Sequence, residues 1–493
     1  MGSKRDCLRR ADLLGVFFPR SARTIVLRSL LVFLGILGSG CGGTGPAKWP
    51  ETARKWYERA EHSYAHAELQ DAQLASEHAL EELPTEPSVR LLAANVALAQ
   101  LDFEGALKAL EGLTGSEAAA LRARAYWQNL QIEETANELD SLALDPDYRD
   151  EWASEISELA HNGRGRRPYE LSGGLVGVTM MLPASGTTWI ISLEVNGEPS
   201  LAMIATDTAE SAIDSKDGEG DWVSLRFGNR IEVSDVPAVG RDLAGISRQV
   251  GAPVKMLLGV NLLRRLNATV DFSGQQFVVR TFEPPAPPAA TTIMPGYYRG
   301  AAMVMPGQFG KGPTAPRAIL LVNSSLLFPL ALDDAGWEKA GQDPASFAAM
   351  PGGGELKHGV VPLLGLGAFE VPRVPGVSGM DLQPIEEKLG VDLDGLAGSG
   401  LFASFRMTFA EQGKILWMED LPPEAIEARR QAAAAAQRRA GDALAGVMGR
   451  APQANSVDSQ KAESQEPAAP GKEAQPSAPK ASPGQSSPTS GAQ

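Results

Sequence analysis

Apolar residues recur at helical spacing from about residue 48 to residue 162, in a segment rich in Ala, Leu and Glu. Gly and Pro are almost absent inside the periodic stretches. This pattern predicts an all-α domain built from amphipathic helices. The basic stretch HNGRGRRP, from His161 to Pro168, has the composition of a linker, so we expect the helical domain to end there.

After the linker, the pattern changes to short apolar and β-branched runs separated by Gly, Pro, Asn and Asp. These runs predict strands and turns as far as residue 420. A Pro-rich stretch, FEPPAPPAATT, divides the region into two mainly-β units, residues 168–283 and 290–420. Residues 421–450 have the Ala/Arg-rich composition of a helix. Residues 451–493 hold too few apolar side chains to build a core, so we expect a disordered C-terminal tail.

The N-terminal residues predict the cellular location of the protein. A short apolar run, SLLVFLGILGSG, follows a basic stretch and ends at Cys41. It has the length of a signal-peptide core and is too short to span a bilayer comfortably. The small residues before Cys41 resemble a bacterial lipoprotein signal, although Gly38 stands where that signal usually has Leu. An ordinary cleaved signal or an uncleaved anchor is the alternative.

The lipoprotein resemblance implies that residues 1–40 are a signal peptide and that Cys41 becomes a lipidated N-terminus. Gly42 in the next position favours the outer membrane of a Gram-negative cell, with the protein facing the periplasm. Cys7 and Cys41 are the two cysteines of the chain, so the mature protein would have no disulfide. The membrane contact would then be the lipid anchor itself.

Length and charge narrow the class of protein further. A chain of 493 residues with 43% hydrophobic and 21% charged residues is typical of a globular protein with several domains. Its net charge is −15, and loss of the seven basic and two acidic side chains of residues 1–40 would leave −20. We therefore expect no binding to nucleic acid or anionic lipid through charge.

A longer period underlies the helical region. Its first unit contains Trp56, Ala60, Ala72, Ala79 and Pro84, the second contains Ala94, Ala106, Leu110 and Leu113, and a weaker third contains Ala123, Trp127, Ala136 and Ala143. These positions resemble the tetratricopeptide repeat, which implies stacked helical hairpins and a surface for protein or peptide partners. A plain bundle of helical hairpins is the alternative.

The β region contains an internal match. Setting Gly259 against Gly398 aligns LLGVNLLRRLNATVDFSGQQFVV with LAGSGLFASFRMTFAEQGKILWM without a gap, and it places Thr269 opposite Thr408. Upstream, we match the Asn of LEVNGEP with the Asn of LLVNSSL. Eleven residues past each Asn are Asp207 and Asp334. The two units are therefore expected to repeat one fold.

Asp207-Thr208-Ala209, followed by the MLLG stretch that ends at Gly259, resembles the active-site turn of the retropepsin-like aspartic peptidases. In that family two units each supply an Asp-Thr-Gly triplet. The two aspartates share a proton, and the threonine hydroxyls of the two loops brace each other. The resemblance implies Asp207 and Asp334 as the catalytic pair, with Thr208 and Gly336 in support, and Asp333 as the alternative to Asp334.

Both triplets depart from the family pattern. Ala209 stands in place of Gly in the first, and Ala335 stands in place of Thr in the second. Glu210 would add a carboxylate beside the first loop, and Trp337 would place a large ring after the second. These departures leave two functions open. One is a membrane-anchored aspartic endopeptidase that acts on cell-envelope proteins or peptides, and the other is an inactive pseudo-peptidase that binds peptides or serves as a scaffold.

The sequence points to neither a metal nor a cofactor. His62 and His66 lie four residues apart on one helical face, a spacing that could bind a metal, but no third ligand accompanies them. We expect exposed surface histidines. We also expect the two β units to pair within one chain rather than between two copies.

Overall fold

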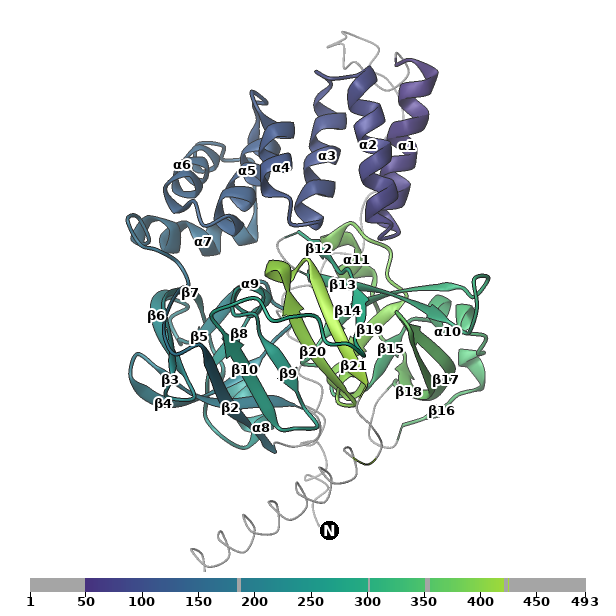
Figure 1. The fold of residues 1–493 in the computed structure, drawn as a ribbon. Helices are drawn as coiled ribbons and strands as arrows, with labels where there is room; N and C mark the ends of the chain where they lie inside the picture. Colours follow the sequence, from purple (N-terminus) through teal and green to yellow (C-terminus); the bar gives the residue numbers. More distant parts are fainter. Residues whose placement is uncertain (1–48, 184–187, 300–301, 351–354, 421–423, 425–493) are drawn as a thin grey trace, which may run out of the picture. The chain divides into compact units, whose positions relative to one another are not determined.

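The computed structural model describes residues 49–183, 188–299, 302–350, 355–420 and 424, which belong to one compact unit. The predicted signal peptide, Cys41, the predicted tail and the predicted helical segment apart from Glu424 lie outside the described residues. The described part begins with helices and continues as a mainly-β region (Figure 1).

Successive helices of the N-terminal region pack against each other in chain order, and α1 also contacts α3 while α3 contacts α5. Their bounds are α1 (Glu51–Ala65), α2 (Leu69–Glu82), α3 (Pro87–Ala99), α4 (Phe103–Leu110), α5 (Ser116–Gln128), α6 (Ile132–Ala143) and α7 (Glu151–Asn162). Small residues make these close contacts possible. Seven of the eight alanines in the repeat match are fully buried: Ala60, Ala72, Ala79, Ala94, Ala106, Ala123 and Ala136. Ala143, by contrast, ends α6 and is exposed.

The first β unit contains a closed barrel of six strands. These are β3 (Trp189–Val195), β4 (Glu198–Ile204), β5 (Ser211–Asp214), β6 (Asp221–Phe227), β7 (Ile231–Arg241) and β8 (Val254–Leu258). They pair in the order β3-β4-β8-β5-β7-β6, and β6 returns to β3. The pairs β4–β8 and β5–β7 are parallel, and the others are antiparallel. Helix α8 (Ala244–Val250) precedes β8.

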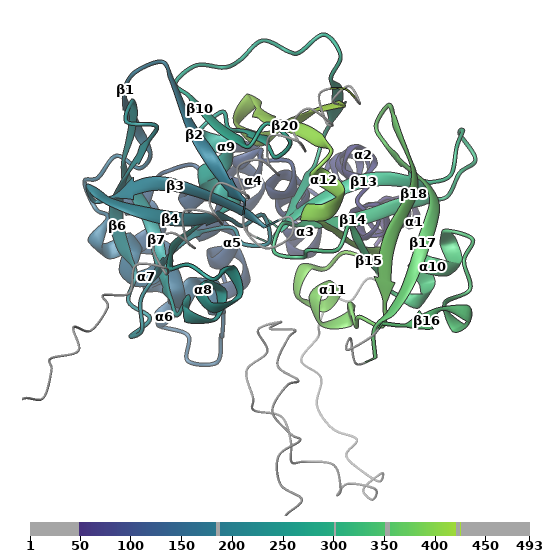
Figure 2. The same ribbon diagram turned by 90° about the horizontal axis from the view of Figure 1, so that it is seen from below.

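The second β unit repeats the strand pairing of this barrel. Figure 2 shows both β units from below. The strands of the second unit are β13 (Ala302–Phe309), β14 (Arg317–Asn323), β15 (Leu330–Leu332), β17 (Lys357–Leu366), β18 (Phe369–Ser378) and β19 (Gly395–Gly398). They pair in the order β13-β14-β19-β15-β18-β17, and β17 returns to β13. Here too the second and fourth pairs are parallel. The repetition agrees with the internal match at Gly259 and Gly398.

Shorter elements complete the second unit and the edges of the sheets. They are β1 (Glu170–Gly173), β12 (Gly296–Tyr298), α10 (Asp334–Lys339), the 3-10 turn Pro344–Ser346, β16 (Ala348–Ala349) and α11 (Gln383–Leu389). Strand β1 pairs with β7, β12 with β13, and β16 with β17.

A six-stranded sheet joins the two barrels. Its order is β2 (Val176–Pro183), β10 (Gln276–Arg280), β9 (Thr269–Asp271), β20 (Phe405–Ala410), β21 (Ile415–Asp420) and β11 (Thr291–Ile293). Helices α9 (Val260–Arg265) and α12 (Ser399–Phe402) lead into the two halves of this sheet, and the 3-10 turn Glu411–Gly413 joins β20 to β21. Because β9 and β20 pair at its centre, the two units associate within one chain.

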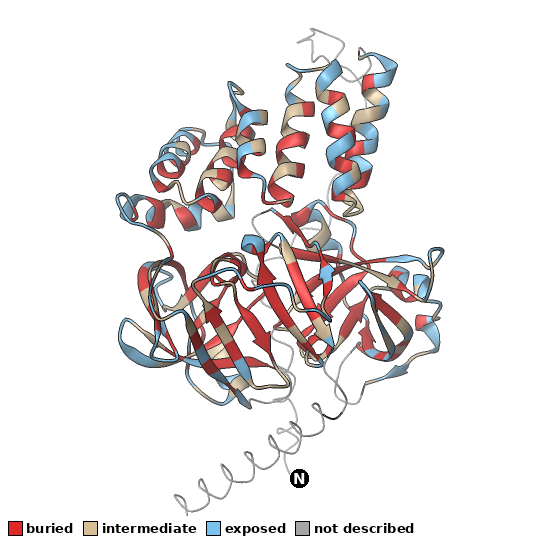
Figure 3. Cartoon of the chain, viewed as in Figure 1, coloured by how far each residue is buried: buried red, intermediate tan, exposed pale blue. Residues whose placement is uncertain are grey.

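The core is continuous across these elements. One cluster of buried side chains runs from both barrels into α3, α4 and α5, and buried residues fill each barrel (Figure 3). Trp189, Phe277 and Phe402 are among its largest members. The helices therefore share the hydrophobic core of the β region.

Side chains of the β region also cap the helices. The last four carbonyls of a helix have no partner within it, and the helix dipole makes that end negative. Tyr298 Oη donates to the Tyr64 carbonyl at the end of α1 (2.9 Å), and Trp222 Nε1 donates to the Leu159 carbonyl in α7 (2.9 Å). Arg265 Nη2 donates to the Gln128 carbonyl at the end of α5 (2.6 Å).

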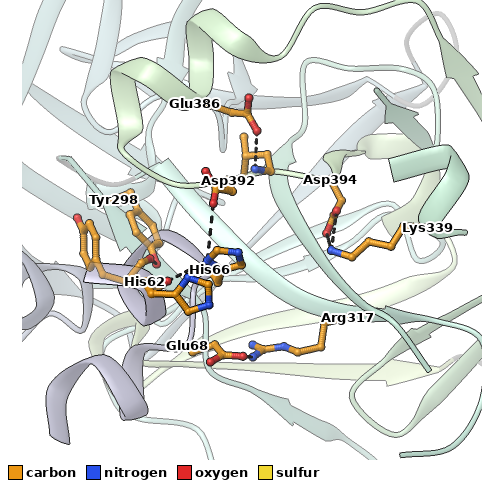
Figure 4. Close-up of polar contacts among 11 residues, drawn as sticks. His62, His66, Glu68, Tyr298, Arg317, Lys339, Glu386, Asp392 and Asp394 are labelled. Carbon is orange, nitrogen blue, oxygen red and sulfur yellow. Dashed lines mark hydrogen bonds and ion pairs between the residues drawn. The ribbon is translucent and has the colours of Figure 1, made fainter. Parts of the chain in front are cut away.

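The contact of α1 and α2 with the second unit is polar as well (Figure 4). The Asp392 N–H donates to the Ala65 carbonyl (2.8 Å), His66 lies 3.6 Å from the Asp392 carboxylate, and Arg317 pairs with Glu68. Further from the helices, Lys339 pairs with Asp394 (2.9 Å).

Candidate functional site at the junction of the barrels

The barrels meet where the loop after β4 crosses the loop after β14. The Thr206 N–H donates to Ser324 Oγ (2.9 Å), and the Ser324 N–H donates to Thr206 Oγ1 (2.9 Å). Each hydroxyl then donates into the opposite loop: Thr206 Oγ1 to the Val322 carbonyl (3.2 Å) and Ser324 Oγ to the Ile204 carbonyl (2.8 Å). Both residues are buried. These four reciprocal bonds are called the hydroxyl brace below.

A second pair of hydroxyls marks the same symmetry in the joining sheet. Thr269 of β9 stands directly opposite Thr408 of β20, and their Oγ1 atoms are 2.8 Å apart. These two threonines are equivalent in the internal match. A residue that pairs with its own counterpart must lie next to a two-fold axis, so Thr269 and Thr408 and the hydroxyl brace define a pseudo-two-fold axis between the barrels.

Two glycines hold the crossing loops in place. Gly259 precedes α9, and the next two N–H groups donate to the carbonyls of Thr208 (3.0 Å) and Ala209 (2.9 Å). On the other side Gly398 precedes α12, and the Ser399 N–H donates to the Leu326 carbonyl (2.8 Å). A Cβ atom at Gly259 would overlap the Glu210 carbonyl, and one at Gly398 would overlap the Phe328 carbonyl. Glycine is therefore required where each loop rests on its support.

The residues that precede the brace carry no carboxylate. Ala205 is buried, with 1% of its surface exposed. Asn323 is half-buried, and its Oδ1 accepts the N–H groups of Ser325 (2.9 Å) and Leu326 (3.1 Å) within its own loop.

Asp207 follows Thr206 and lies against the second loop. Its Oδ1 accepts a hydrogen bond from Ser325 Oγ (2.9 Å). Desolvation by the surrounding protein raises the pKa of this carboxyl, and the hydrogen bond from Ser325 opposes the shift. The side chain itself remains exposed, so the shift reflects the density of nearby protein rather than enclosure. Exposed Asp207 and half-buried Ser325 thus place polar groups from both units at the junction.

The other predicted residues lie elsewhere. Asp333 caps α10 and accepts the N–H of Gly336 (2.7 Å), and burial raises the pKa of its carboxyl. Asp334 is the first residue of that helix, is exposed, and accepts a hydrogen bond from Ser378 Oγ (3.3 Å). Gly336 is buried, and a Cβ atom there would overlap the Asp394 carbonyl.

Asp207 and Asp334 do not occupy equivalent places. Asp207 follows β4, whose counterpart is β14, whereas Asp334 follows β15. The upstream part of the internal match is therefore wrong by one strand, because Asn196 lies in the turn between β3 and β4 and Asn323 ends β14. The structural counterpart of Thr206 is Ser324. Thr208 does not cross to the other unit in the described hydrogen bonds, since its hydroxyl donates to the Glu210 carbonyl in its own loop (3.0 Å).

Two residues expected to disturb the site are packing residues instead. Trp337 is fully buried in the second barrel, where its ring lies edge-on to Phe347 at 4.8 Å and its Nε1 donates to the Val377 carbonyl (3.3 Å). Space for the ring comes from Gly359 and Gly376, since a Cβ atom at either would press on it.

Glu210 points away from the junction. Its Oε1 accepts hydrogen bonds from Trp127 Nε1 of α5 (3.0 Å) and from Asn261 Nδ2 of α9 (3.0 Å). Burial raises the pKa of this carboxyl, and the two hydrogen bonds oppose the shift. Arg264 lies in the same cluster and donates to Asn261 Oδ1 (3.1 Å) and to the Gln128 carbonyl (3.2 Å). Burial lowers the pKa of Arg264 to about 10.

The histidine pair lies at the contact between helices and barrel. The rings of His62 and His66 are 4.0 Å apart, and His66 Nδ1 lies 2.9 Å from the His62 carbonyl (Figure 4). In the part of the chain that the structure describes, no group of three His, Cys, Asp or Glu side chains is arranged to hold a metal ion.

Comparison with known protein families and curated proteins does not assign the chain to a family. No protein-family model matches the chain, and no curated protein matches its sequence at a significant level. Within the described ranges, no helix combines the length and the apolar character needed to cross a bilayer.

Proposed function

We propose that this protein is a non-catalytic, peptide-binding scaffold whose two barrels form a retropepsin-like pair. The hydroxyl brace carries the proposal. In the retropepsin-like family the braced threonine follows the catalytic aspartate, so Thr206 and Ser324 put Ala205 and Asn323 in the aspartate positions. A methyl group and a neutral amide cannot share a proton or activate a water molecule as two carboxyls do.

The hydrolytic alternative requires Asp207 and Asp334 to act as one dyad. A dyad needs two carboxyls close enough to hold a single proton. The described partner of Asp207 is Ser325, which follows β14. The described partner of Asp334 is Ser378, which ends β18, and β19 and β15 lie between β14 and β18 in the sheet. The contacts therefore favour binding over hydrolysis.

In this proposal an extended peptide lies over the pseudo-two-fold axis. Exposed Asp207 and half-buried Ser325 offer it hydrogen-bonding groups, and the tetratricopeptide-like helices offer a second protein-binding surface. The lipid at Cys41 holds the protein at the outer membrane, facing the periplasm. Its ligands are proteins or peptides of the cell envelope, and it binds no nucleic acid.

A photo-crosslinking experiment tests this proposal. A benzophenone amino acid replaces Ser325 in the chain, and the matched control replaces Leu144, which is 84% exposed at the end of α6. We expect peptides from a random library to crosslink at position 325 well above the control, and we expect none to be cleaved between pH 3 and pH 7.

Two results would decide against it. Cleavage that both Asp207→Asn and Asp334→Asn abolish would establish the peptidase. Crosslinking at position 325 no greater than at position 144 would remove the binding role of the junction.

A further inference from the structure

A small cavity lies between the helices and the first β unit. Its lining includes Trp127 and Gln128 from the end of α5, Asn261 and Arg264 from α9, and Tyr169, which precedes β1. The centre of a water-sized sphere can occupy about 10 Å³ of this cavity, which is room for one water molecule. A ligand of the cavity is therefore no larger than a water molecule or a single ion.

The polar side chains that line the cavity are buried. Gln128, Asn261 and Arg264 are 5%, 3% and 2% exposed. Arg264 donates from Nε to Asn261 Oδ1 (3.1 Å) and from Nη2 to the Gln128 carbonyl (3.2 Å).

Two buried polar atoms of these side chains are left open. Arg264 Nη1 and Gln128 Oε1 have no hydrogen-bond partner among the residues that the structure describes. Buried polar groups of folded proteins are nearly always hydrogen-bonded, and leaving the donor of a buried cation without a partner is especially costly. The cavity thus offers one open donor and one open acceptor to a ligand.

This pair of groups selects the chemistry of the ligand. The ligand must accept a hydrogen bond from Arg264 and donate one to Gln128. An anion cannot donate, and the Glu210 carboxyl, bound by Trp127 and Asn261, lies next to the same lining. A cation would be repelled by the Arg264 guanidinium. Water both donates and accepts, and it has the size of the cavity.

We propose that this cavity binds one water molecule, which accepts a hydrogen bond from Arg264 Nη1 and donates one to Gln128 Oε1. The water joins the side chain of α5 to α9, beside the direct bond from Arg264 to the Gln128 carbonyl. Helix α9 in turn supports the junction loop through the N–H groups of Val260 and Asn261. The water is therefore part of the contact between the helices and the support of that loop. The proposal does not depend on the function of the junction.

A high-resolution crystal structure of the full chain tests the site. We expect one oxygen peak in the cavity, within hydrogen-bonding distance of both Arg264 Nη1 and Gln128 Oε1. Crystals grown in sodium bromide should show no anomalous peak there. A cavity without density, a peak that contacts only one of the two atoms, or an anomalous bromide peak would overturn the proposal.

A substitution gives a measurement in solution. Gln128→Met keeps the length of the side chain and the backbone carbonyl that Arg264 binds, but it deletes the acceptor of the water. We expect oxygen-17 relaxation dispersion of the solvent to show one long-lived internal water fewer in this variant than in the wild type.

Gln131→Met is the matched control. Gln131 does not belong to the cavity lining, and its Oε1 accepts an exposed hydrogen bond from Asn129 Nδ2 (2.9 Å). The number of long-lived waters should therefore stay at the wild-type value in this variant. An unchanged number in Gln128→Met, or an equal loss in both variants, would refute the site. If Gln128→Met does not fold, the wild-type crystal structure decides the proposal.

Discussion

Removal of one hydroxyl from the brace tests which threonine joins the barrels. Thr206→Val keeps the shape of the side chain but deletes the acceptor for the Ser324 N–H and the donor to the Val322 carbonyl. Both groups are buried, and a buried donor left without a partner costs about 1–3 kcal/mol. We therefore expect Thr206→Val to lower the free energy of unfolding by about 2 kcal/mol.

The brace also predicts how two substitutions combine. Ser324→Ala deletes the acceptor for the Thr206 N–H and the donor to the Ile204 carbonyl, so its cost should be similar. Because the two residues contact each other, the double variant should lose less than the sum of the single losses once the loops have separated. Urea unfolding followed by tryptophan fluorescence measures all three values.

Thr208→Val is the matched control. It is the same substitution two residues away, and it removes one half-buried hydrogen bond within a loop. Its expected cost is below about 1 kcal/mol. A loss at Thr208 as large as the loss at Thr206 would refute the assignment of the brace, and so would the absence of a measurable loss at Thr206.

Three further predictions concern the surroundings of the brace. Gly259→Ala and Gly398→Ala should each lower the free energy of unfolding in urea by about 1–3 kcal/mol, because the new Cβ overlaps a loop carbonyl. Gly245→Ala, where a Cβ meets nothing within 4 Å, should be neutral or stabilising. Equal effects at the three positions would contradict the close approach. Burial raises the folded-state pKa of Glu210, so the stability that its carboxyl contributes is complete below the unfolded pKa and is lost as pH rises through the folded pKa. Between these two pKa values the wild type should lose up to about 1.4 kcal/mol of unfolding free energy per pH unit relative to Glu210→Gln. Unfolding free energies of the two proteins that change with pH in the same way would contradict this. If Ala205 and Asn323 occupy the aspartate positions, the variant with Asp at both should titrate in NMR as a coupled pair with one raised pKa, while each single variant should not; independent titration would refute the correspondence.

The sequence predicts the parts of this fold that rest on local pattern. Helical spacing marks the N-terminal helices, and the gapless match at Gly259 locates the equivalent halves of the joining sheet, including the opposed Thr269 and Thr408. The helical spacing and the gapless match can both be read within one short continuous stretch of sequence, because the residues concerned belong to consecutive turns or strands.

The brace is harder to predict, because it is made by residues 118 positions apart. Thr206 and Thr208 both follow an apolar run, and the resemblance of Asp207-Thr208-Ala209 to Asp-Thr-Gly favours Thr208. A usable signal was present: AMIAT and LLVNS each end an apolar strand with a residue followed by a hydroxyl. Matching strand ends instead of the two Asn residues would have paired Thr206 with Ser324.

The environments of Glu210 and Trp337 could not be predicted for the same reason. A carboxylate beside a loop gives no local sign that its partners are Trp127 and Asn261, from helices on either side of it in the chain. The space for Trp337 likewise depends on Gly359 and Gly376, which only the closed barrel brings to its ring.

Because the two β units belong to one chain, their sequences do not have to be identical. In a homodimer every substitution occurs twice, and a residue on the axis always faces its own copy. Here the axis passes between Thr206 and Ser324, which are chemically alike but not identical. The residues that precede them, Ala205 and Asn323, are not alike. One half can therefore change its groups at the junction while the other keeps its own. A peptide bound over the axis, as we propose, would meet different chemistry at its two ends and would be bound in a single direction.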